Sequence, residues 1–232
     1  MRLISITPTN PTLRVLCIGI STKTLREFVK RLSDIALSGL VLLAMTPVII
    51  FVALAIRLDS PGPVLFQQLR MGKGARPFRI LKFRTMVWGA EQLLDDLEAC
   101  NWAQPSVFFR IKNDPRVTRV GWFLRRTSLD ELPQLFNVLR GEMSVVGPRP
   151  HAMAHDRQFA EFADKYAFRH HVKAGMTGWA QVHGARGEID TAEKIQRRVD
   201  LDLWYVKHWS LALDFSILFR TVVVVLHGKN AY

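Results

Sequence analysis

The sequence contains little cysteine. Only two cysteines, Cys17 and Cys100, occur in 232 residues, and they lie far apart. This scarcity argues against a disulfide framework and against a zinc site built on cysteine, and it favours a reducing location that faces the cytoplasm. Residues 1–25 also lack the apolar core and small-residue cleavage site of a signal peptide, so we expect a loosely ordered N-terminal extension there.

Acidic side chains are too few to balance the basic ones. Lysine and arginine together number 32 against 20 aspartates and glutamates, which gives a formal net charge of +12. Such a charge favours anionic partners, namely nucleic acid, acidic lipid or phosphorylated substrates. Because 49% of the residues are hydrophobic, we expect a membrane surface and no nucleic-acid partner. The length suits one domain, with or without an added membrane element.

Long hydrophobic runs are absent except at residues 35–56, which carry no charge. As one helix rising about 1.5 Å per residue, this run would be about 33 Å long, enough to cross a bilayer core of about 30 Å. Pro47, preceded by Thr46, lies near its middle, where proline bends or breaks a helix. The hydroxyl group of Thr46 or Ser38 could satisfy the backbone groups that such a break frees.

The charges beside this run bear on how it meets the membrane. Both flanks are basic, with Lys23, Arg26, Lys30 and Arg31 before the run and Arg57, Arg70, Lys73, Arg76, Arg79, Lys82 and Arg84 after it. Because positively charged flanks stay in the cytoplasm, we predict that residues 26–57 form a re-entrant helical hairpin, which enters and leaves the membrane by one face. A kinked transmembrane helix is the alternative that the composition leaves open.

The remaining residues, 58–232, are predicted to form a cytoplasmic catalytic domain that is mainly α-helical with short strands. Residues 78–86 have strand propensity with interleaved basic residues. Leu132, Leu135, Phe136 and Leu139 have the spacing of one helical face, which predicts a helix that ends before Gly141. We also expect helices at 88–100, 156–170 and 191–209, a glycine-rich loop at 175–187, and an amphipathic helix at 210–226 that lies in the membrane interface near Trp204 and Trp209.

Two adjacent acids, Asp130 and Glu131, invite two interpretations. The first is a capping box, in which Ser128 caps a helix and Glu131 lies three residues further on. In that register Pro133 would be the fifth helical residue, where its missing N–H group weakens the helix. A helix that starts nearer Pro133 would release both acids from a capping role. The spacing alone leaves both interpretations open.

The second interpretation is chemistry on a phosphate. Arginine binds phosphate through paired hydrogen bonds, and Arg125 and Arg126 lie close by in sequence. A carboxylate can attack phosphorus to form an acyl phosphate, and a divalent ion such as Mg²⁺ would relieve the repulsion between the acid and the phosphates. His151 and His155 have the spacing of a metal-binding pair, but no HExxH pattern or nearby cysteine supports that role.

Three stretches resemble the bacterial sugar transferase family of monotopic polyprenol-phosphate phosphoglycosyl transferases. They are "KFRTM", "DPRVTRVGWFLRRTSLDELPQLFNVLRGEMSVVGPRP" and "GMTGWAQVHGARG". The resemblance extends from about Arg26 to Tyr232, and the stretch from His151 with the ending "NAY" is most similar to undecaprenyl-phosphate glucose phosphotransferases. It implies a membrane hairpin broken at Thr46 and Pro47, and a location on the cytoplasmic face of the bacterial inner membrane.

The resemblance also implies a reaction. A sugar 1-phosphate would pass from a UDP-sugar to undecaprenyl phosphate through a covalent aspartyl-phosphosugar, with release of UMP, as the first membrane step in the assembly of an exopolysaccharide or another surface glycan. The sequence leaves open the sugar and the oligomeric state, a homo-oligomer included. The rival interpretations are a basic peripheral membrane or nucleic-acid-binding protein without enzymatic activity, and an aspartyl-phosphate phosphatase.

The residue roles follow from the matching motifs. Asp130 would be the nucleophile and a ligand of Mg²⁺, with Glu131 as its partner, and Arg125 would hold the polyprenol phosphate. Phosphate or nucleotide binding is implied for Pro148, Arg149, Pro150, Lys82 and Arg84, although simple attraction to anionic lipid is the alternative for Lys82 and Arg84. Many family members have proline and isoleucine where this chain has Ala174 and Met176. Larger relatives carry further membrane helices and a domain before the hairpin, so we expect a core-only form.

Overall fold

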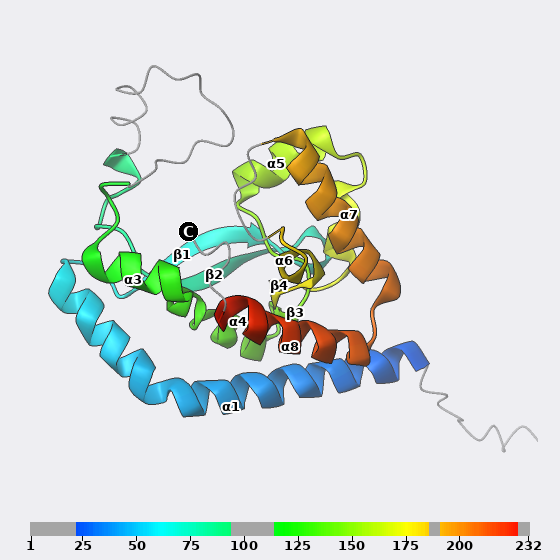
Figure 1. The fold of residues 1–232 in the computed structure, drawn as a ribbon, viewed down its shortest axis with the longest axis horizontal. Coiled ribbons are helices and arrows are strands. Elements are labelled where there is room, and N and C mark those ends of the chain that lie inside the picture. The colour runs from blue at the N-terminus through cyan, green and yellow to red at the C-terminus, as the bar shows by residue number, and fades with distance from the viewer. Residues whose placement is uncertain (1–21, 94–113, 186–190, 227–232) are drawn as a thin grey trace, which may run out of the picture.

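A computed structural model describes residues 22–93, 114–185 and 191–226 (Figure 1). It confirms a mainly helical chain with short strands. The helices are α1 (Thr22–Asp59), α3 (Arg119–Thr127), α4 (Gln134–Arg140), α5 (Met153–Phe162), α6 (Trp179–Val182), α7 (Ala192–His208) and α8 (Leu211–Leu226). The 3₁₀ turns are η1 (Lys73–Ala75), η2 (Leu129–Glu131) and η3 (Tyr166–His171). The strands are β1 (Leu65–Met71), β2 (Pro77–Phe83), β3 (Ser144–Val146) and β4 (Gly175–Thr177). The extension predicted at 1–25 and most of the helix predicted at 88–100 lie outside the described residues.

The four strands form two small two-stranded sheets. Strands β1 and β2 form an antiparallel hairpin, whereas β3 and β4 pair in parallel. A Cβ atom on Gly175 would lie 2.1 Å from the backbone nitrogen of Gly147, so these two chains approach as closely as glycine permits. The segment predicted as a glycine-rich loop at 175–187 contains β4 and α6.

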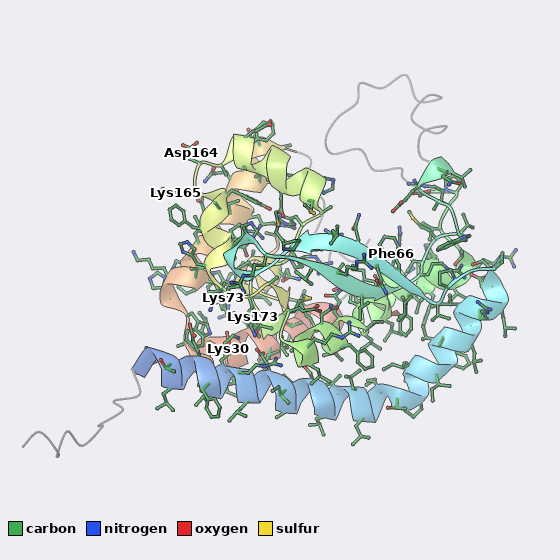
Figure 2. The ribbon with its side chains drawn as sticks, turned by 180° about the vertical axis from the view of Figure 1, so that it is seen from behind. Lys30, Phe66, Lys73, Asp164, Lys165 and Lys173 are labelled. Atoms are coloured by element: carbon green, nitrogen blue, oxygen red, sulfur yellow. The ribbon has the colours of Figure 1, made fainter. Side chains whose placement is uncertain are left out.

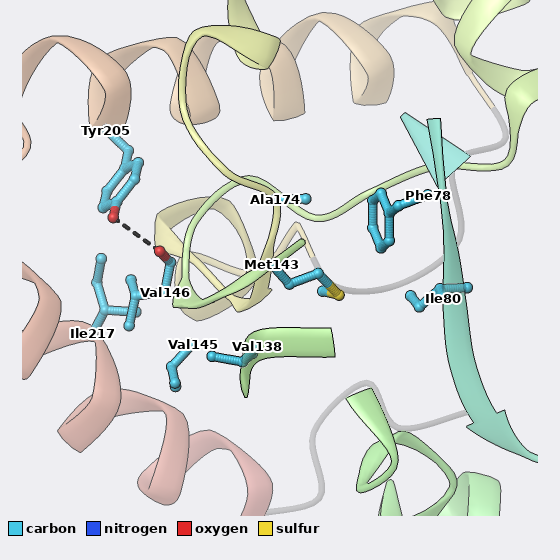
Figure 3. Packing of buried hydrophobic residues seen from close by; sticks show 9 residues of the cluster. All are labelled: Phe78, Ile80, Val138, Met143, Val145, Val146, Ala174, Tyr205 and Ile217. Atoms are coloured by element: carbon cyan, nitrogen blue, oxygen red, sulfur yellow. Dashed lines mark hydrogen bonds between the residues drawn. The ribbon is translucent and has the colours of Figure 1, made fainter. Parts of the chain in front are cut away.

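The main core lies where β2, β3, β4, α4, α7 and α8 meet (Figure 3). Its buried members are Phe78, Ile80, Val138, Met143, Val145, Val146, Ala174, Tyr205 and Ile217. The hydroxyl group of Tyr205 lies 3.1 Å from the carbonyl oxygen of Val146 and 2.7 Å from Oδ1 of Asp214. The indole N–H of Trp209 donates to Oδ2 of the same aspartate at 3.1 Å, so Trp209 is tied to this core.

Helix α1 runs along one side of the molecule and bends around it (Figure 1). The helix continues through Pro47, where the sequence predicted a break. The Thr46 hydroxyl donates to the carbonyl oxygen of Leu42 at 2.8 Å, a bond that favours bending, but the carbonyl that Pro47 leaves without its helical partner belongs to Leu43. The hydroxyl of Ser38 is buried and finds no hydrogen-bond partner among the described residues. The path of α1 through a bilayer stays a prediction.

The outer surface of α1 is apolar. Among the described residues, α1 is the one helix that is long and apolar enough to cross a membrane. Large exposed hydrophobic side chains continue onto α3 and α8, and the set includes Leu40, Leu43, Phe51, Leu54, Leu58, Trp122, Phe123, Phe215 and Phe219. Helix α8 buries Asp214 and Ile217 while exposing Phe215 and Phe219, which is the amphipathic character that the sequence predicted for residues 210–226. This surface is compatible with membrane association.

The close approach of Gly147 and Gly175 generates a testable prediction. Gly175→Ala would force β3 and β4 apart, so we expect a loss of at least about 2 kcal/mol in the free energy of unfolding. Gly39→Ala is the matched control, because a Cβ atom there meets nothing within 4 Å and alanine is the better helix former. Thermal unfolding in detergent would measure both, and equal stability of the two variants would contradict the described packing.

Candidate active site

The two acids lie in a tight turn between two helices. Helix α3 ends at Thr127, and Ser128 adopts a left-handed conformation with a φ of 59°. Asp130 and Glu131 follow in η2, and α4 begins only after Pro133. The side chain of Ser128 makes no capping hydrogen bond, so the capping box is not formed. Both acids precede the helix, as a start near Pro133 required.

Glu131 is held by two cations from distant parts of the chain. Lys82 Nζ on β2 lies 3.1 Å from Oε1, and Arg149, just after β3, donates from Nη1 to Oε2 at 3.1 Å and from Nη2 to Oε1. Burial alone would raise the pKa of Glu131, but Arg149 and Lys82 outweigh it and hold the pKa far below its ordinary value. Glu131 is therefore a fixed anion whose oxygens are already engaged.

Asp130 differs from its neighbour although both are acids. It is only 9% exposed, yet among the described residues its carboxylate makes no hydrogen bond, and its closest cation is Lys82 Nζ at 3.7 Å. Burial raises the pKa of Asp130 and nearby Glu131 adds to the rise, while Lys82 opposes it. Two neighbouring carboxyl groups in different environments can take different roles, and Asp130 is the one with oxygens available for a substrate.

Arg125 and residues 148–150, the Pro-Arg-Pro segment, also lie at or near Asp130 and Glu131, the acidic dyad. The carbonyl oxygen of Pro148 accepts from Gly175 N at 2.9 Å, and that of Pro150 lies 3.4 Å from Nη1 of Arg70, so the backbone on both sides of Arg149 is held. Beside Arg149 lies a cavity whose lining includes both prolines. Arg125 donates from Nε to the Thr85 hydroxyl at 2.9 Å, and its charge weakly opposes the rise in the pKa of Asp130.

Arg84 lies away from the dyad, although the motif assigned it to phosphate binding. Its guanidinium is buried and donates to the carbonyl oxygens of Ser60 at 2.7 Å and of Pro61. These carbonyls follow the end of α1, so Arg84 closes the C-terminal end of that helix. Lys82 lies on β2, which ends one residue before Arg84, and it is the residue of the two that the structure brings to the acids.

A buried polar network behind Arg149 escaped the sequence analysis. Arg169 donates to the carbonyl oxygen of Arg149 at 2.8 Å and to Asp202 at 2.8 Å. His151 is also buried there, with Nδ1 2.7 Å from the Tyr166 hydroxyl, and burial with the charge of Arg169 lowers its pKa far below the ordinary value. No local motif marks Arg169, because its partners lie 20 and 33 residues away.

The donor set bears on the expected Mg²⁺. Within residues 22–93, 114–185 and 191–226, no three His, Cys, Asp or Glu side chains gather into a metal site, and His151 faces Tyr166 while His155 stacks on Phe159. A protein-only metal cage is therefore not formed by these residues. Mg²⁺ is commonly held by one or two carboxylates together with substrate phosphates, and the carboxylate of Asp130, which makes no hydrogen bond among the described residues, fits that arrangement.

Comparison with known proteins matches the chain to a family model and to several relatives. The family model described as "Bacterial sugar transferase" matches residues 25–228. The UDP-glucose:undecaprenyl-phosphate glucose-1-phosphate transferase of Escherichia coli (strain K12) is 48% identical over 206 residues, 89% of this chain but 42% of that protein. The protein of the same name from Caulobacter vibrioides is 46% identical over 203 residues, 88% of this chain and 72% of its own length.

A third relative is matched over nearly its whole length. The exopolysaccharide production protein PSS of Rhizobium leguminosarum bv. phaseoli is 46% identical over 205 residues, 87% of this chain and 97% of that protein. The match to the family model covers most of the chain and includes Asp130, Glu131 and Arg149. The chain belongs to the bacterial sugar transferase family.

Proposed function

We propose that this protein transfers a sugar 1-phosphate from a UDP-sugar to undecaprenyl phosphate and releases UMP. The observation that carries the proposal is the contrast between Glu131, which two cations bind through hydrogen bonds, and Asp130, whose carboxylate makes no hydrogen bond among the described residues and has only Lys82 within 4 Å as an ion-pair partner. The names of the E. coli and Caulobacter relatives state this reaction for glucose, so UDP-glucose is the favoured donor. The chain spans about two fifths of the length of the first of these relatives.

The reaction would proceed in two displacements at the phosphorus that carries the sugar. A carboxylate oxygen of Asp130 forms a bond to this phosphorus, the bond to the bridging oxygen breaks, and UMP leaves with the electron pair. A phosphate oxygen of undecaprenyl phosphate then attacks the same phosphorus, and the acyl-phosphate bond breaks to return the Asp130 carboxylate. Splitting the transfer in this way lets the two substrates use one site in turn.

The basic residues around Asp130 would hold the phosphates. Lys82 and Arg149 keep Glu131 ionised and would place positive charge within reach of a diphosphate, and Arg125 would bind the lipid phosphate. Mg²⁺ bound through Asp130 would neutralise charge on the diphosphate. Glu131 supports the reaction by holding Lys82 and Arg149 in place.

The lipid acceptor fits the apolar surface formed by α1, α3 and α8. We propose that the bend of α1 enters the cytoplasmic leaflet and that both of its ends remain on the cytoplasmic side. The side chains from Leu43 to Pro47, at the bend, are all exposed, as burial in lipid rather than in protein requires. A kinked span is the competing arrangement.

Replacing the nucleophile tests the reaction directly. We expect Asp130→Asn to lower UMP release from UDP-glucose at least about 1,000-fold, while the protein stays in the membrane fraction. Asp164→Asn, which changes an exposed acid, is the matched control and should keep normal activity. Normal turnover by Asp130→Asn would refute the mechanism. Free phosphate produced without any lipid product would favour a phosphatase instead.

Metal removal tests the role assigned to Mg²⁺. We expect EDTA to abolish UMP release and excess Mg²⁺ to restore it, because an unshielded diphosphate repels the carboxylate of Asp130. Light scattering should show that the EDTA-treated protein remains unaggregated, since the described fold contains no metal cage. Full activity in EDTA would remove Mg²⁺ from the proposal without affecting the role of Asp130.

Cysteine labelling tests the path of α1. In a background with Cys17 and Cys100 replaced by serine, we expect Leu25→Cys and Leu58→Cys to react with a membrane-impermeant maleimide only from the cytoplasmic side, since the bend returns the helix to that face. Leu43→Cys at the bend should resist labelling in intact membranes. If Leu25→Cys and Leu58→Cys react from opposite faces, α1 is a kinked span.

A further inference from the structure

One turn of α1 makes polar contacts that are unusual for an apolar helix. The side chains of Lys30, Arg31 and Asp34 contact α8, α4 and β3, respectively. Figure 2 shows Lys30 on that side of the helix. Asp34 is only 5% exposed, whereas the neighbouring Leu32 and Ile35 are exposed. The catalytic mechanism uses none of the three polar residues.

Arg31 reaches the helix that follows the dyad. Its Nη1 and Nη2 donate to the carbonyl oxygens of Val138 and Leu139 at 2.5 and 2.6 Å. These are carbonyls of the last turn of α4, where a cation also complements the helix dipole. Helix α4 begins three residues after Glu131 and is only about 10 Å long at 1.5 Å per residue, so fixing its end also fixes the turn that carries the dyad.

Asp34 and Lys30 reach the strand that precedes Arg149. Oδ1 of Asp34 accepts from the backbone N–H of Val145 and from the hydroxyl of Ser144, both at 3.0 Å. Lys30 Nζ donates to the carbonyl oxygen of Val146 at 3.2 Å and pairs with Asp214 at 2.6 Å. Val146 ends β3 three residues before Arg149, so this strand is held from the same turn of α1.

We propose that the turn from Lys30 to Asp34 positions the Glu131–Arg149 pair, with Arg31 and Asp34 as positioning residues; this inference rests on the proposed function. Glu131 belongs to the segment held by Arg31, and Arg149 belongs to the segment held by Asp34. Apolar contacts allow two elements to slide, whereas charge-assisted hydrogen bonds set both distance and direction. The turn therefore sets the separation of the two catalytic segments, and it links the placement of α1 in the membrane to the geometry of the site.

The test combines a kinetic and a structural readout on the full chain in nanodiscs. We expect Arg31→Ala to lower kcat for UMP release at least about 10-fold with the KM for UDP-glucose changed less than about 3-fold, because a misplaced dyad slows chemistry more than binding. Arg31→Lys should recover most of the loss. The matched control is Arg26→Ala, which removes the same charge from an exposed position on the same helix and should leave kcat unchanged.

A second background separates positioning from general destabilisation. In Arg149→Lys, which cannot form the paired bonds to Glu131, we expect Arg31→Ala to lower kcat by less than about 3-fold, since coupled residues act non-additively. Equal losses in the two backgrounds would overturn the inference, as would an Arg31→Ala enzyme that matches Arg26→Ala.

Hydrogen exchange provides a readout that does not depend on activity. We expect Arg31→Ala to raise amide exchange in peptides covering residues 129–140, and Asp34→Asn to raise it in peptides covering 144–150, with Arg26→Ala changing neither. Unchanged exchange in both peptides would overturn the inference. If the wild-type protein releases no UMP while these exchange changes occur, the proposed function fails and the structural role of the turn stands.

Discussion

The arrangement of this protein depends on one partly buried carboxylate, that of Glu131. Lys82 comes from a strand 49 residues earlier and Arg149 from a loop 18 residues later, and both bind the same side chain. Removing a carboxylate from water is costly unless cations and hydrogen bonds compensate, so Glu131 draws β2, η2 and the Pro-Arg-Pro segment to one point. The two cations then remain beside Asp130, where they can meet a phosphate.

The scaffold behind this ion pair is built for close approach rather than for a large sheet. The backbones at Gly147 and Gly175 approach so closely that neither glycine can be replaced by a residue with a side chain. This contact fixes the position of β3, which leads into the loop that carries Arg149. Arg169 holds the backbone of that loop from behind, and Asp202 neutralises Arg169 in turn. Buried hydrogen bonds between charged groups add rigidity, so Arg169 and the close pairing of β3 and β4 both restrain the position of Arg149.

Local signals in the sequence predicted the parts of the site that local structure decides. Pro133, the spacing of Leu132, Leu135 and Leu139, and Gly141 located α4 and freed the acids from a capping role, because those signals act within a few residues. The resemblance implied phosphate binding for Lys82 and Arg149, and the structure brings both to Glu131. Local signals could not show which of Lys82 and Arg84 contacts the acids. The two residues lie two positions apart and differ only in their distant partners, which are Glu131 for Lys82 and Ser60 for Arg84. Local signals missed Arg169 for the same reason.

The path of α1 shows how distant contacts also shape a segment whose local signal was strong. Pro47 predicted a break, and the structure has a bend in a continuous helix. Before the bend, Arg31 and Asp34 bind α4 and β3. After it, Ile56 packs with Phe83 and Leu124 in a second core cluster, and Arg84 closes the helix end. Positions 31 and 56 lie about 37 Å apart along the helix at 1.5 Å per residue, and a straight helix of that length meets a rounded body over only part of its length. The bend turns both arms toward the rest of the protein (Figure 1), so contacts at both ends of α1 favour the bent path together with the hydrogen bond that Pro47 cannot form.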